Sequence, residues 1–134
     1  MAKIEDIEGI GPTFGQKLRA AGIESIDDLL KACCDKKGRK ATCDKTGIDE
    51  DKLLKWANHA DLMRIKGVGP EFAELLEAAG VDTCKELKNR KPENLAAKMA
   101  EVNAAKKLTR QTPSVSQVTR WVEEAGQLQP VITH

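Results

Sequence analysis

Two short glycine-containing segments are the residues of this chain whose types and spacing suit ligand binding. Ile7-Glu8-Gly9-Ile10-Gly11 and Ile65-Lys66-Gly67-Val68-Gly69 are each followed by a proline. We call residues 7–11 the first glycine turn and residues 65–69 the second. Glycine permits a tight backbone turn, and proline suits the first position of a helix. A helix that starts there presents unpaired backbone N–H groups, an arrangement that holds anions such as phosphate.

Metal binding and catalysis have weaker support. The residues that invite a zinc proposal are Cys33, Cys34, Cys43 and His59. Adjacent cysteines followed by long gaps do not match the paired spacing of structural zinc sites. Neither His59 nor His134 has a nucleophile or an acidic partner at motif spacing, and the carboxylates are spread along the chain. We therefore expect no catalytic residues, no metal, no cofactor and no small-molecule substrate.

The elements that position the glycine turns are expected to be helices. Only 3% of the 134 residues are aromatic, and the apolar residues are mostly Leu, Ile, Val and Ala, which suits packed helices better than a β-sandwich. No segment alternates apolar and polar residues as a strand would. No apolar run approaches the roughly 20 residues of a membrane span, and the start of the sequence lacks the apolar stretch of a secretory signal. We expect a cytoplasmic protein with reduced cysteines.

An internal repeat organises the chain. When the second glycine turn is aligned on the first, Gly67 matches Gly9, and in the same register Phe14 matches Phe72 and Leu18 matches Leu76. The agreement continues through Ala20-Ala21-Gly22-Ile23 and Ala78-Ala79-Gly80-Val81, and Cys84 takes the place of Ile26. Because Ile26 and Cys33 fall on one apolar helical stripe, both Cys33 and Cys84 are expected to be small core residues.

The repeat resumes around the two tryptophans in a longer register. Trp56 corresponds to Trp121, so the second copy holds a short insertion before its tryptophan, within Pro92–Thr112. That segment predicts an inserted or lengthened helix. Each tryptophan lies in an apolar helical stripe, which favours a role in the core over stacking on bases. Two units follow: residues 1–60 with the Trp56 helix, and residues 61–134 with the inserted helix and the Trp121 helix.

The pattern around each turn resembles the helix-hairpin-helix motif, and nearly the whole chain is similar to a bacterial family of tandem helix-hairpin-helix proteins of unknown function. Segments that carry this resemblance are Lys37-Gly38-Arg39-Lys40, residues 61–69, Glu93-Asn94-Leu95, Glu101-Val102-Asn103, Lys106-Lys107-Leu108 and Pro113-Ser114. Members are often labelled as similar to the DNA-binding hairpin of flap endonucleases. The resemblance implies an all-α fold of two tandem helix-hairpin-helix repeats with accessory helices, packed as one compact domain. It also implies association with DNA without sequence preference.

The two copies differ in charge where phosphate would bind. Residues 12–22 carry Lys17 and Arg19 and no acid, whereas residues 70–80 carry Glu71, Glu74 and Glu77. A carboxylate in the first turn of a helix suits the helix dipole but competes with phosphate for the same N–H groups. The first turn is therefore the better candidate for DNA. The alternative is that both turns only connect core helices.

Duplex DNA is the leading expected partner, through residues of both turns, Lys17 and a basic cluster in residues 36–45. The candidate nucleic-acid-binding residues are Gly9, Ile10, Gly11, Thr13, Lys17, Lys37, Arg39, Lys40, Gly67, Val68 and Gly69. Solvated helix faces give the same basic pattern in a sequence. A formal net charge of +1 and the acidic second copy favour the rival expectation, a protein–protein adaptor that binds no nucleic acid. A continuous basic face that includes residues 9–17 would favour DNA, whereas patchy charge would favour the adaptor.

Overall fold

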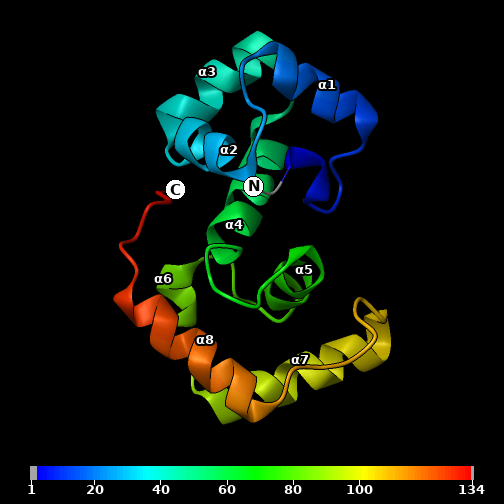
Figure 1. Ribbon diagram of the computed structural model, residues 1–134, viewed down its shortest axis with the longest axis vertical. Coiled ribbons are helices and arrows are strands. Elements are labelled where there is room, and N and C mark those ends of the chain that lie inside the picture. Colours follow the sequence, from blue (N-terminus) through cyan, green and yellow to red (C-terminus); the bar gives the residue numbers. More distant parts are fainter. Residues whose placement is uncertain (1–2, 134) are drawn as a thin grey trace. The chain divides into compact units, whose positions relative to one another are not determined.

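The computed structural model describes residues 3–133, and in this range every regular element is a helix (Figure 1). The chain divides into two compact units. One comprises the residues up to Asp61 together with those from Val131 onward, and the other comprises Leu62–Pro130. Extended pairing in the described range is limited to one isolated bridge between Lys3 and Ser25. None of these helices has the length and apolar character needed to cross a bilayer.

Unit 1 begins with a short 3-10 helix, η1 (Ile4–Asp6). The helices that follow are α1 (Pro12–Ala20), α2 (Ile26–Cys33), α3 (Lys36–Thr46) and α4 (Glu50–Leu62), the last ending at the boundary between the units. Ser25 starts α2 as a capping box, since its side chain accepts the N–H of Asp28 and the Asp28 carboxylate accepts the N–H of Ser25. In Figure 1, α2 packs beside α3.

Unit 2 repeats the order of the four α-helices, without a counterpart of η1 among its described residues. Its helices are α5 (Pro70–Ala78), α6 (Cys84–Leu87), α7 (Pro92–Lys106) and α8 (Val115–Gln127). Thr83 caps α6, as Ser25 caps α2. The extra residues of the second copy lie in a longer helix and a longer connection: α7 has 15 residues where α3 has 11, and residues 107–114 precede α8 where residues 47–49 precede α4. Helices α7 and α8 lie side by side (Figure 1).

The two glycine turns have the same backbone path. Gly9 has φ +93° and Gly67 has φ +91°. The turns are closed by the N–H of Ile10 on Ile7 O and by the N–H of Val68 on Ile65 O, both at 3.1 Å. After each turn the first helical hydrogen bond, at 2.9 Å, ends on the O atom of Gly11 or Gly69. The repetition expected from the aligned glycine turns is therefore present in the backbone.

An aromatic pair lies beneath each turn. Phe14 packs on Trp56 and Phe72 packs on Trp121, with ring centroids 5.2 Å apart in both pairs. Both tryptophans are 3% exposed, so their expected place in the core is confirmed. Cys33 and Cys84 are buried as well, and burial raises the pKa of the Cys33 thiol.

The first glycine turn allows a stability test with a control in the same turn. Gly9→Ala should lower the free energy of unfolding by about 1–2 kcal/mol, because an L side chain at φ +93° is strained. Its Cβ would also lie 3.4 Å from Trp56 Nε1. Gly11→Ala should cost less, since Gly11 has φ −86° and no atom lies within 4 Å of its Cβ position. Chemical denaturation of both variants measures the difference, and equal losses would contradict this account.

Candidate nucleic-acid interface

The start of α1 offers backbone donors to solvent. Its N-cap residue, Gly11, makes no side-chain capping bond, and Pro12 has no N–H. The first helical hydrogen bond comes from Gly15, so within the described residues the N–H groups of Thr13 and Phe14 meet no acceptor. Gly11 and Thr13 are exposed. This combination leaves an open approach for an anion to the positive end of the helix.

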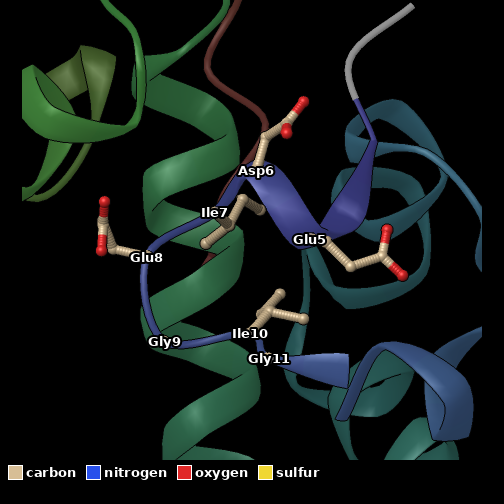
Figure 2. A pocket seen from close by; sticks show the side chains of 7 residues that line it. All are labelled: Glu5, Asp6, Ile7, Glu8, Gly9, Ile10 and Gly11. Atoms are coloured by element: carbon tan, nitrogen blue, oxygen red, sulfur yellow. The ribbon is translucent and has the colours of Figure 1, made fainter. Parts of the chain in front are cut away.

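The residues of the first glycine turn divide between the core and the surface. Ile7 and Ile10 point inward and are buried (Figure 2). Between them Gly9 is exposed, so Ile10 can contact a ligand only through its backbone. A shallow pocket of about 380 Å³ follows this turn and is lined by residues 5–11.

Three of the residues that line this pocket carry carboxylates. They lie before residue 12, so comparing the charges of residues 12–22 with those of residues 70–80 leaves them out. Figure 2 shows the side chains of Glu5, Asp6 and Glu8 pointing in three different directions. Together with the cations of α1, these carboxylates give the surface around the first glycine turn both signs of charge.

Across residues 3–133 no three His, Cys, Asp or Glu side chains gather closely enough to hold a metal ion.

Arg19 is compensated by one of these carboxylates. Its guanidinium donates two hydrogen bonds to Glu5, at 2.9 Å from Nε and 2.7 Å from Nη2. This paired bonding lowers the pKa of Glu5 to about 2. Of the two cations predicted to charge α1, only Lys17 remains without a carboxylate partner in the part of the chain that the structure describes.

A second lysine approaches the same place from α4. The ammonium groups of Lys17 and Lys52 lie 5.9 Å and 6.0 Å from the centroid of the Phe14 ring, within the range of cation–π attraction. Sequence reasoning missed Lys52, because it lies far from Lys17 along the chain and on a different helix. The available signal is its spacing: Lys52 lies four residues before Trp56 on the same helix and therefore shares the face that packs on Phe14.

The basic cluster of α3 needs one correction. Lys37 and Lys40 are exposed, but Arg39 is only 3% exposed. Its guanidinium donates to Cys33 O at 3.0 Å and to Thr133 O at 2.8 Å. Arg39 therefore binds backbone within unit 1, and its guanidinium is not part of the exposed basic surface on which the expected contact with nucleic acid depended.

The second glycine turn differs from the first in the carboxylates that lie close to its backbone N–H groups. The backbone N–H of Lys66 donates to both carboxylate oxygens of Glu124, at 3.2 Å and 3.3 Å. Glu71 lies in the first turn of α5. An anion at this turn would meet two carboxylates, although the backbone of Gly67, Val68 and Gly69 repeats that of the first turn.

A comparison with known protein families identifies the family of this chain. Residues 8–128 match the family described as a domain of unknown function, DUF4332. The chain belongs to the DUF4332 family. No curated protein and no solved structure matches it. The match covers residues 8–11 of the first glycine turn, the whole second turn and both tryptophan helices of this DUF4332 chain.

The ion pair between Glu5 and Arg19 predicts a pH dependence of stability. Because the folded-state pKa of Glu5 is lowered from 4.5 to about 2, its contribution is complete above pH 4.5 and is lost as the pH falls toward 2. Glu5→Gln should therefore flatten the decline in unfolding free energy over this interval. Denaturant titrations at several pH values compare the variant with the wild type. A decline of equal steepness in both proteins would contradict the assignment.

Arg39 gives a test of its structural role. Arg39→Gln should lower the free energy of unfolding by about 1–3 kcal/mol, because the buried Cys33 carbonyl and the partly buried Thr133 carbonyl lose charge-assisted donors. Lys40→Gln, a neighbouring exposed change, should alter stability by less than about 0.5 kcal/mol. Thermal denaturation measures both variants. Similar small effects would place Arg39 on the surface after all.

Proposed function

We propose that this DUF4332 chain is a non-enzymatic binding protein that holds the phosphates of duplex DNA without reading base sequence. The observation that carries the proposal is the uncapped start of α1, where exposed Gly11 and Thr13 leave N–H groups without acceptors. Helix starts of this kind bind phosphate. The resemblance to helix-hairpin-helix proteins supports the same use of the turn, and we propose that the two repeats are tandem helix-hairpin-helix units.

Two cations give this site its charge. Lys17 on α1 and Lys52 on α4 both approach Phe14, next to the turn that the N–H groups follow. Lysine contacts with phosphate release counterions, which makes affinity fall steeply with salt. Backbone N–H groups and point charges contact the phosphate chain and carry no base information. The proposed binding is therefore independent of sequence.

A protein–protein adaptor is the second candidate, and the mixed charge around the first glycine turn favours it. Glu5, Asp6 and Glu8 line the pocket there, and one of them neutralises Arg19. A surface of both signs is complementary to a protein surface of both signs, whereas a polyanion is repelled by its acidic members. The adaptor would use the same helices and bind no nucleic acid.

A titration of labelled duplex DNA at low salt separates the two candidates. Lys17→Glu and Lys52→Glu should each weaken binding by about tenfold and reduce the dependence of log affinity on log salt by about one unit. Lys98→Glu, an exposed change on α7, is the charge-matched control. Absence of binding to duplex and single strands would reject the DNA proposal in favour of the adaptor. Equal losses in all three variants would show a diffuse electrostatic surface without a dedicated site.

A matched pair of variants tests how much the backbone N–H groups contribute to DNA binding. Gly11→Val places two methyl groups near the free N–H groups, and Gly69→Val does the same at the repeat-related position. Both glycines have negative φ, and no atom lies within 4 Å of either Cβ position, so both variants should fold. Gly11→Val should weaken DNA binding more, because Glu71 and Glu124 already disfavour phosphate near Gly69. Equal effects of the two variants would contradict the assignment to the first turn.

A further inference from the structure

A cleft in unit 2 lies between the second glycine turn and α8. It encloses about 350 Å³ and is lined by Lys66, Gly67, Gln117, Arg120, Trp121 and Glu124. A more open hollow shares three of these residues, Lys66, Arg120 and Glu124, and is also lined by Glu123. All lining residues belong to one compact unit, so the cleft is a property of unit 2 alone.

The cleft contains donors that have no acceptor. Trp121 is 3% exposed, and its Nε1 lies 3.3 Å from the Cβ position of Gly67. The Trp121 Nε1–H has no acceptor within residues 3–133 and is not fully enclosed by protein, so a ligand in the cleft can reach it. The side chain of Arg120 forms no ion pair in the same range, even though Glu123 and Glu124 follow it at helical spacings of three and four.

Two of the acceptors that line the cleft are already engaged. Both oxygens of Glu124 accept the backbone N–H of Lys66. Gln117 Oε1 accepts the N–H of Ser114 at 3.0 Å in the capping box of α8. Apart from these acceptors, the polar side-chain groups of the lining residues are donors: the indole N–H, the guanidinium, the Lys66 ammonium and the Gln117 amide. Their complement is an anion with several acceptor oxygens.

We propose that this cleft binds a small oxyanion, the carboxylate or phosphate group of a small molecule. Arg120 and Lys66 supply its counter-charges, and the Trp121 Nε1–H donates to one of its oxygens. Glu124 keeps the Lys66 N–H occupied and limits how much negative charge the cleft accepts. The site is separate from the first glycine turn and does not depend on DNA binding.

The first copy does not repeat this chemistry. When the glycine turns are aligned, Glu8 takes the place of Lys66, and when the tryptophans are aligned, His59 takes the place of Glu124. An anion beside Trp56 would therefore meet the carboxylate of Glu8 where unit 2 offers an ammonium group. Lys55 takes the place of Arg120, so the surroundings of the two tryptophans differ chiefly at Lys66 and Glu124.

The test is an NMR titration of the full chain, whose two tryptophans give two indole N–H signals, assigned with Trp121→Phe. Inorganic phosphate and sodium acetate are added separately at constant ionic strength. We expect the Trp121 signal to move to saturation. Phosphate bound at the first glycine turn would move the Trp56 signal in a separate titration curve, because Trp56 Nε1 lies 3.4 Å from the Cβ position of Gly9. Saturation by phosphate alone identifies a phosphate group as the ligand, saturation by acetate alone identifies a carboxylate, and saturation by both identifies the shared oxyanion chemistry.

Variants link the shift to the cleft. Arg120→Gln should weaken binding about tenfold, the loss expected for one charge-assisted contact. Arg110→Gln, an exposed change outside the cleft, should leave it unaltered. Glu124→Gln should strengthen binding, because it removes a negative charge and still offers an oxygen to Lys66 N–H. No saturable shift of the Trp121 signal with either anion, or equal effects of the two arginine variants on that shift, would overturn the proposal.

Discussion

The contact between a phenylalanine and a tryptophan beneath each glycine turn is the interaction on which the rest of each unit depends. It joins the helix that follows the turn to the later tryptophan helix, with the same centroid separation in both copies. The tryptophan reaches the turn itself, where its Nε1 lies close to the Cβ position of Gly9 or Gly67. Only glycine combines the positive φ with room for the indole. The turn, the helix start and the tryptophan helix are therefore constrained together.

The same backbone carries two different surfaces. In unit 1, Glu5 and Asp6 precede the turn, Glu8 lies within it, and cations follow on α1 and α4. In unit 2 the order of charges is reversed: Arg64 precedes the turn, Lys66 lies within it, and glutamates follow along α5. Packing requires the glycines and the aromatic rings but leaves the exposed positions free to vary. Duplication has thus kept a scaffold and changed what each copy presents to solvent.

Periodicity and the internal repeat were enough to predict the helices, the paired turns and the buried tryptophans. These features depend on residues close in sequence or on positions that recur in both copies. The errors and omissions at the candidate site have a different origin. Arg39 lies in a basic run, but its acceptor Thr133 O is 94 residues away, so sequence alone gives no sign of its burial. The same holds for the pairing of Arg19 with Glu5 and of Lys66 N–H with Glu124, which join separate elements.

The short C-terminal segment makes unit 1 discontinuous in sequence. Thr133 exchanges hydrogen bonds with unit 1 through its own N–H to Cys34 O and through its O atom from Arg39, and Ile132 is buried. Unit 2 is therefore, in topological terms, an insertion within unit 1. A contiguous fragment that stops at Asp61 would leave the Arg39 Nη2 group without this acceptor. A fragment of residues 62–130 contains every residue of unit 2, because that unit is continuous in sequence. The two copies, alike in backbone, are unequal as autonomous folding units.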